Sequence, residues 1–181
     1  MKKIFCFLIV MIVFFGANAQ EHLTFEGIPI DGTLDQFTKQ LENKGYEILK
    51  MEDNAALLKG SFEGYNNCQV IAGIGENKDK VGLVVVLSSG YKKWSKVYKS
   101  YSSLKNEYIK RYGEPKETNE NFGDPKIKKP ADIVKKLHEG NDYSCTFSLE
   151  QGNILLSVMY SSDLDLHLMI AYNDKINGVE E

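Results

Sequence analysis

A short and clearly marked helix constrains the fold of this chain more than any other stretch. Thr33 suits the N-cap position, because its hydroxyl can accept from an unpaired amide of the first turn. Gln36 can return a bond to the Thr33 amide and complete a capping box. Leu34, Phe37 and Leu41 then share one face. A helix of about three turns is unstable alone, so this one must pack on the strand-rich run behind it.

The run that follows this helix is typical of a series of short strands. We expect strands at 46–50, 55–62, 68–74 and 81–87, with polar or glycine-containing turns between them. Residues 81–87 are almost entirely apolar, as expected of a central strand. The first part of the chain therefore predicts one helix followed by four strands.

The second part of the chain follows the same order. An aromatic-rich amphipathic helix is predicted over 91–112, and its large rings are interpreted as core. A strand near Glu117 leads into a polar surface loop within 116–130, and a short helix follows at 131–139. Two strands are predicted at 143–150 and 154–160. A last strand carries Leu164, Leu166, Leu168 and Ile170 on one face, before a polar, frayed tail from Asn173.

Two such units predict an α+β fold. Each unit is a helix with a four-stranded antiparallel sheet, and the helices cover one face of the sheet. The first unit spans 20–90 and the second 91–181, and we expect them to pack as one globular body. Because the sequence identity between the halves is weak, this tandem α-β4 repeat is a hypothesis of structural duplication.

Two stretches carry a family resemblance. Residues 22–33, HLTFEGIPIDGT, together with 110–115, KRYGEP, resemble a family of small exported proteins of Bacteroides-type bacteria. That family has no assigned activity, so the resemblance implies no catalytic residues. The tandem α-β4 plan is also similar to the beta-lactamase inhibitor protein (BLIP-like) fold, and this likeness rests on architecture alone.

The N-terminus is typical of an export signal. Two lysines precede the apolar run 4–15, and the small residues 17–19 form a cleavage pattern, so a signal peptide of residues 1–19 cleaved after Ala19 is expected. The product would be periplasmic or extracellular, without a membrane span. Removing the two signal lysines takes the net charge from −3 to −5, which argues against nucleic acid as a partner.

Two cysteines remain after signal cleavage. Cys68 and Cys145 could form one disulfide in an oxidising compartment, or they could be two separate buried thiols. Both alternatives are open at this point, and neither cysteine belongs to a C-x-x-C motif.

Two groups of side chains are weak site candidates. Asp163, Asp165 and His167 could ligate a metal, but same-face positions on a strand lie ~7 Å apart, which favours a solvated sheet face instead. A basic stripe on the outer side of the long helix could meet an acidic partner or could simply be solvated. No catalytic or cofactor motif is present, so no cofactor is expected. The stripe consists of Lys92, Lys96 and Lys99.

These observations favour a non-enzymatic binding or inhibitory module of the cell envelope or extracellular space. Its partner would be a protein or glycan of the envelope, bound by an open sheet face or by the loop within 116–130. The alternatives are a hydrolase with an unrecognised site, since paired carboxylates need not be close in sequence, and an envelope structural component.

Overall fold

The computed structural model describes residues 21–76, 79–161 and 165–178. The predicted signal segment lies outside the described residues. Within them, no helix is both long enough and apolar enough to cross a membrane. The helices are α1 (Leu34–Asn43), α2 (Trp94–Tyr112) and α3 (Pro130–His138). The strands are β1 (Thr24–Phe25), β2 (Ile28–Pro29), β3 (Glu47–Met51), β4 (Ala55–Phe62), β5 (Tyr65–Ile74), β6 (Val81–Leu87), β7 (Glu117–Asn119), β8 (Tyr143–Leu149), β9 (Gly152–Tyr160) and β10 (Leu166–Asp174).

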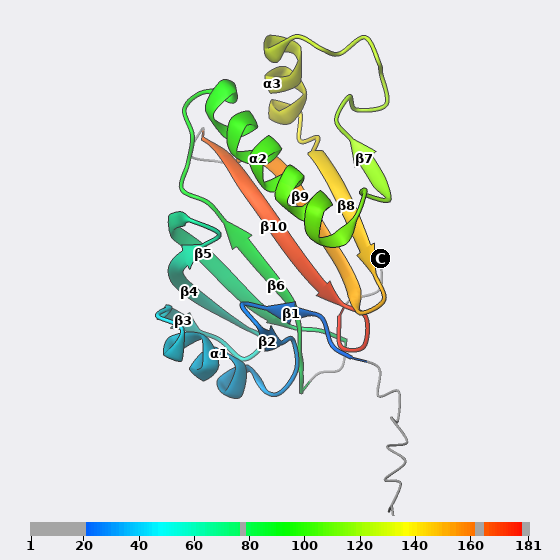
Figure 1. Ribbon diagram of the computed structural model, residues 1–181. Helices are drawn as coiled ribbons and strands as arrows, with labels where there is room; N and C mark the ends of the chain where they lie inside the picture. Colours follow the sequence, from blue (N-terminus) through cyan, green and yellow to red (C-terminus); the bar gives the residue numbers. More distant parts are fainter. Residues whose placement is uncertain (1–20, 77–78, 162–164, 179–181) are drawn as a thin grey trace, which may run out of the picture.

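Eight of the strands form one antiparallel sheet, which confirms the predicted α+β class. The order across this sheet is β3-β4-β5-β6-β10-β9-β8-β7, and every neighbouring pair is antiparallel. Strands β1 and β2 pair separately in a small hairpin that lies across the sheet (Figure 1). The strands preceding α2 and those following it therefore meet only along β6 and β10.

The first helix forms as its sequence predicts. The Gln36 amide donates to the Thr33 hydroxyl at 3.3 Å, and the Thr33 amide donates to the Gln36 side chain at 3.1 Å, so both halves of the capping box are present. Leu34, Phe37 and Leu41 are buried on the face that turns toward the sheet. Gly45 then takes a φ of 93°, a conformation that favours glycine at a helix end.

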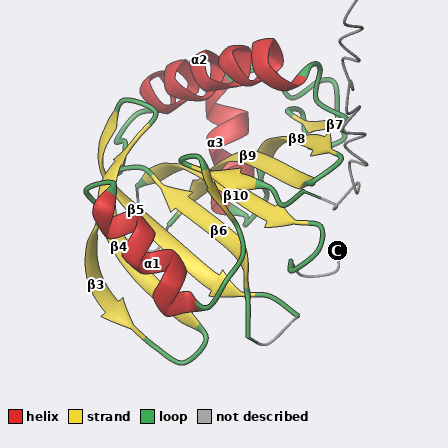
Figure 2. Cartoon of the chain, turned by 60° about the horizontal axis from the view of Figure 1, so that its bottom comes forward, coloured by secondary structure: helices red, strands yellow, loops and turns green. Residues whose placement is uncertain are grey.

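The helices cover one face of the sheet (Figure 2). Helix α1 packs over β3, β4 and β5, and α2 packs over β9 and β10. A row of cross-strand neighbours on this covered face is at most 1 % exposed, and it runs without a break from β4 to β8. The row consists of Leu58, Val70, Val86, Ile170, Leu156 and Cys145.

The inner face of α2 is aromatic core, as predicted. Trp94, Tyr101 and Tyr108 are buried, and the rings of Trp94 and Tyr101 both contact the ring of Tyr143 on β8. The interpretation as core does not extend to every ring of the helix. Tyr98 is 44 % exposed and Tyr112 is 37 % exposed.

The prediction of a frayed tail from Asn173 was wrong. Strand β10 continues to Asp174, and both Asp174 and Asn177 are buried polar residues. The Asp174 carboxylate accepts from the amides of Ile176 and Asn177, which folds the following residues into a turn. A polar segment is therefore ordered because its own aspartate satisfies its backbone.

The disulfide alternative for the two cysteines is also corrected. Cys68 lies on β5 and Cys145 on β8, and both are free, buried thiols. Strands β6, β10 and β9 stand between them, and four interstrand spacings of about 4.8 Å separate the two backbones by about 19 Å. A disulfide needs Cα atoms less than about 7 Å apart, so the sheet excludes the bridge.

We predict that the chain from residue 20 onward has two unreactive thiols when folded. Burial raises the pKa of both Cys68 and Cys145, which lowers the reactive thiolate fraction. Alkylation with iodoacetamide should add no mass to the native protein and two carbamidomethyl groups in denaturant without reductant. A product that takes up the label only after reduction would contradict this arrangement.

Candidate functional site

The second face of the large sheet is not covered by α1, α2 or α3. Alternation along each strand and the cross-strand register identify the side chains that line it. We call this surface the open face. On β5, β6, β10, β9 and β8 it consists of Gln69, Ile71, Gly73, Leu83, Val85, Leu87, His167, Met169, Ala171, Asn173, Asn153, Leu155, Met159, Ser144, Thr146 and Ser148, while Ser157 has the same orientation but is buried.

The centre of the open face is apolar. One row of direct cross-strand neighbours crosses it, and these side chains are partly exposed rather than buried. Leu83, Leu87 and Met169 lie one same-face position from the row along their strands, and Met159 lies two positions from it. An antiparallel sheet with one free face usually alternates apolar-in with polar-out, and this sheet departs from that pattern. The central row consists of Leu57, Ile71, Val85, Ala171 and Leu155.

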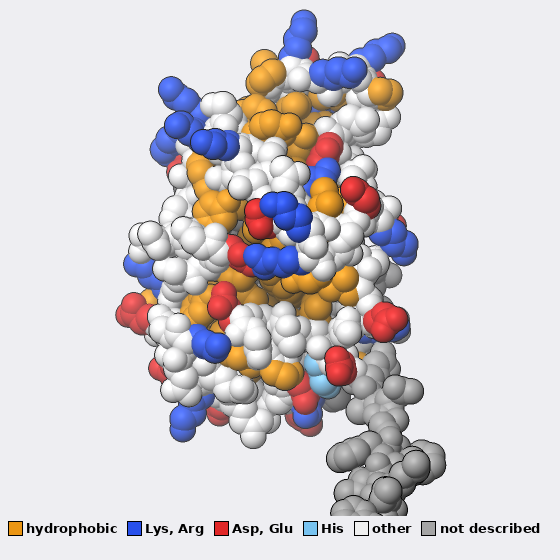
Figure 3. Space-filling view, viewed as in Figure 1, with side chains coloured by type: hydrophobic (Ala, Val, Ile, Leu, Met, Phe, Trp, Pro, Cys, Tyr) orange, Lys and Arg blue, Asp and Glu red, His pale blue; other side chains and the backbone are white. Residues whose placement is uncertain are grey.

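The open face carries no formal charge over its five central strands. Its polar members there are serines, threonine, amides and His167, with no Lys, Arg, Asp or Glu among the side chains just named. Among the described residues, charged side chains of this face lie at its margins, with Glu47 on β3 opposite Lys59 on β4, Glu117 on β7, and Asp165, paired with Lys92, just before β10. The covered side of the molecule differs, because Lys, Arg, Asp and Glu side chains are scattered over it (Figure 3).

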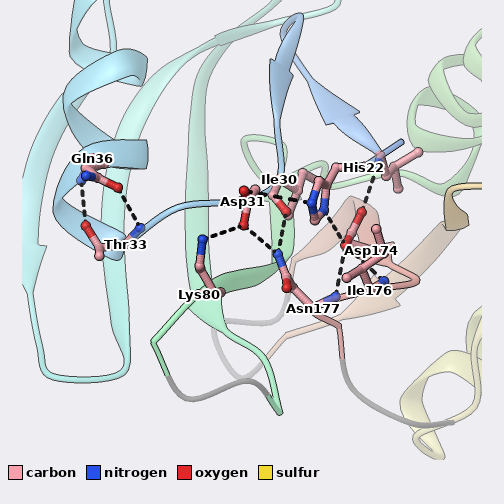
Figure 4. Close-up of polar contacts among 10 residues, drawn as sticks. His22, Ile30, Asp31, Thr33, Gln36, Lys80, Asp174, Ile176 and Asn177 are labelled. Atoms are coloured by element: carbon pink, nitrogen blue, oxygen red, sulfur yellow. Dashed lines mark hydrogen bonds and ion pairs between the residues drawn. The ribbon is translucent and has the colours of Figure 1, made fainter. Parts of the chain in front are cut away.

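Apart from the open face, a cluster of polar side chains joins the two ends of the described chain (Figure 4). The Asp174 carboxylate accepts from the Leu23 amide at 2.6 Å and contacts His22 Nδ1 at 3.0 Å. The Asn177 amide group donates to the Ile30 carbonyl at 3.3 Å and to the Asp31 carboxylate at 3.0 Å. The cluster therefore ties the first strands to the end of β10.

This cluster is a structural joint. The Gly32 amide lowers the pKa of Asp31, and Lys80 and Asn177 add to the effect against the opposing cost of burial. His22 Nε2 lies 3.8 Å from Asp31 and its Nδ1 faces Asp174, so both ring nitrogens face carboxylates. No serine, threonine or cysteine takes part in these contacts, and a nucleophile activated by His22 is therefore lacking among the described partners.

The weak site candidates do not converge. Asp163 lies outside the described residues, and no group of three or more metal-binding side chains occurs in the part that the structure describes. Asp165 pairs with Lys92 at 2.5 Å, and His167 Nδ1 lies 2.8 Å from the Ser88 carbonyl oxygen. Lys96 and Lys99 are exposed on the outer side of α2. The basic stripe is thus solvated, and its first lysine is held by an aspartate.

Sequence reasoning missed the Asp174 cluster, although a local signal was present. Asn177 and Gly178 lie three and four residues after Asp174. An aspartate in such a turn accepts from the backbone amides two and three residues later. The role of His22 had no such signal, because its partners are 9 and 152 residues away in sequence.

No protein-family model, curated protein or solved structure matches this chain. The resemblance drawn from residues 22–33 and 110–115 stays a prediction.

Proposed function

We propose that this protein is an exported, non-enzymatic binding or inhibitory module that holds a partner protein against its open face. The observation that carries the proposal is the uncharged apolar surface on the uncovered side of the sheet. Soluble proteins rarely leave a large contiguous apolar patch facing water, and such patches commonly mark interaction sites.

The composition of the open face favours a protein over a glycan. A stable protein interface has an apolar centre depleted in charge and a polar rim, and methionine is enriched in it. The open face shares part of this arrangement, because Met169 and Leu87 lie in the row on one side of the apolar row, Asn153 and Asn173 lie in the row on its other side, and Met159 lies farther out. Flexible methionine side chains can adapt to the shape of a partner. Sugar rings are usually stacked on aromatic side chains, and none lines this face.

Structural duplication is part of the proposal. The sheet order is β3 to β6 on one side and β10 to β7 on the other, so each side is a four-stranded meander. Helices α1 and α2 precede these meanders in sequence, which supports a tandem α-β4 plan, although α3 has no counterpart in the first half. Two joined meanders offer a partner one wide surface, and export to the envelope or medium would place that surface among extracellular proteins.

A crosslinking experiment followed by a binding measurement tests the proposed function. Benzoylphenylalanine at Leu155 should crosslink a protein from envelope or medium fractions, which is then identified and purified. Val85→Lys should weaken binding of that protein at least about tenfold in calorimetry, because a lysine would be desolvated in the apolar centre. Leu49→Lys is the matched control, since Leu49 is 48 % exposed on β3, and its affinity should stay within about twofold.

Each remaining outcome counts against the proposal. If Val85→Lys and the unchanged protein bind the partner with equal affinity, the partner binds a surface other than the open face. A crosslink only to a second copy of the chain, with a dimer that Val85→Lys dissociates, would make the open face an oligomer interface. Turnover of a polysaccharide or peptide by the purified protein, with no partner captured, would favour the hydrolase alternative.

A further inference from the structure

A cavity lies on the covered side of the molecule, where α2, the loop after β7 and the start of α3 meet. Its volume is about 560 Å³, within the range of ligand-binding clefts. Hydrophobic side chains gather where α2 and α3 meet in the space-filling view (Figure 3). Because the cavity is on the opposite side of the sheet from the open face, it is independent of the proposed function. It is lined by Trp94, Ser95, Tyr98, Glu120, Asn121, Pro125, Ile127, Lys128, Pro130, Ile133 and Tyr143.

Three aromatic rings form one wall of this cavity. Tyr98 stacks on Trp94 with ring centroids 5.5 Å apart, and Tyr143 meets both rings edge-on at 5.0 and 6.3 Å. Trp94 and Tyr143 are buried, which holds the wall rigid, whereas Tyr98 is 44 % exposed. A rigid aromatic platform with one accessible ring suits a flat apolar ligand face.

An oriented carboxylate stands at the same cavity. Glu120 Oε1 accepts from the Tyr101 hydroxyl at 2.9 Å and from Lys105 Nζ at 2.6 Å. These two donors fix the carboxylate and use one of its oxygens, and Oε2 has no hydrogen-bond partner among the described residues. The Asn121 side-chain oxygen accepts from the Gly123 amide at 3.2 Å, which leaves the Asn121 NH₂ group as a donor.

The geometry points to a binding site for a neutral pyranose sugar, as one ring of an oligosaccharide. A pyranose ring has an apolar face that can stack on Tyr98 and hydroxyl groups that can donate to Glu120 and accept from Asn121. Lys105 balances the charge of Glu120, and Lys128 is exposed to solvent, so the cavity suits a ligand without net charge. A proline-rich peptide would also stack on tyrosines, but a prolyl residue has no N–H to donate to Glu120.

Trp94 reports on this site directly, because it is the only tryptophan in the chain. Its fluorescence should change saturably when the chain from residue 20 onward is titrated with at least one of maltotriose, cellotriose and chitotriose. Tyr98→Ala and Glu120→Gln should each raise the dissociation constant at least about tenfold, by removing the stacking face or the charged acceptor. Tyr112→Ala is the control, because Tyr112 is an exposed tyrosine at the other end of α2, and its constant should be unchanged.

Three results would overturn the sugar site. One is the absence of any Trp94 response to all three sugars while circular dichroism shows a folded protein. Another is an equal response in Tyr98→Ala and Glu120→Gln, which would place the sugar elsewhere. The third is a response to a proline-rich peptide alone, which would assign the cavity to peptide recognition. None of these results depends on the open face, so Val85→Lys should bind the sugar as the unchanged protein does.

Discussion

Asp174→Ala should destabilise the protein by about 3–5 kcal/mol, since each unsatisfied buried donor costs about 1–3 kcal/mol. The carboxylate is 1 % exposed and accepts from the amides of Leu23, Ile176 and Asn177 at 2.6, 3.1 and 3.0 Å. An alanine would leave all three amides without an acceptor. Urea denaturation of the chain from residue 20 onward at pH 7 measures the loss as a lower transition midpoint.

Two matched variants separate the carboxylate from its histidine contact. Asp174→Asn keeps the shape and one acceptor oxygen, so its cost should be about half that of the alanine variant. His22→Ala removes one hydrogen-bond partner of the carboxylate and should cost about 1 kcal/mol, because the three amides still satisfy its oxygens. A loss below about 1 kcal/mol for Asp174→Ala would show that water satisfies the amides and that the joint is weak.

Phe25→Ala should cost a similar amount, about 3–5 kcal/mol, through the cavity that a deleted buried ring leaves. Phe25 is 1 % exposed, and its ring stacks on Phe62 of β4 at 5.3 Å and meets Tyr172 of β10 edge-on at 5.5 Å. The small hairpin of β1 and β2 thus inserts one ring between the two meanders. The same urea titration measures the change.

Graded substitutions test whether packing is the cause. Phe25→Leu keeps much of the buried volume and should lose about 1–2 kcal/mol, while Leu49→Ala at an exposed position should stay within about 0.5 kcal/mol. Equal losses for Phe25→Leu and Phe25→Ala would mean that the ring geometry, rather than the filled volume, stabilises the hairpin.

Most elements of this fold could be predicted from local signals. The capping box at Thr33 and Gln36 and the runs 55–62 and 81–87 reappear as α1, β4 and β6, because caps and apolar runs act over a few residues. Apart from the local turn at Asp174, whose signal was overlooked, the failures involve contacts between distant residues. The end of β10 and the separation of Cys68 from Cys145 depend on strand order, which periodicity does not encode.

The candidate surfaces were predictable only in part. Residues 81–87 are apolar on both faces of β6, and sequence alone cannot tell whether the second face is buried or free. The cavity at Trp94 could not be predicted from the sequence for a related reason. The spacing of the aromatic residues in α2 predicts that all of them belong to the core. The exposure of Tyr98 depends instead on the path of the loop before α3.

The position of β10 has a consequence for synthesis. It is the last described strand in sequence, yet it lies between β6 and β9. A nascent chain must therefore extend beyond residue 166 before β6 gains its second neighbour. Until then the apolar run Val81–Leu87 presents an unpaired edge, a template for association with other chains. Unfinished or truncated copies should for this reason depend on chaperones far more than the complete chain does.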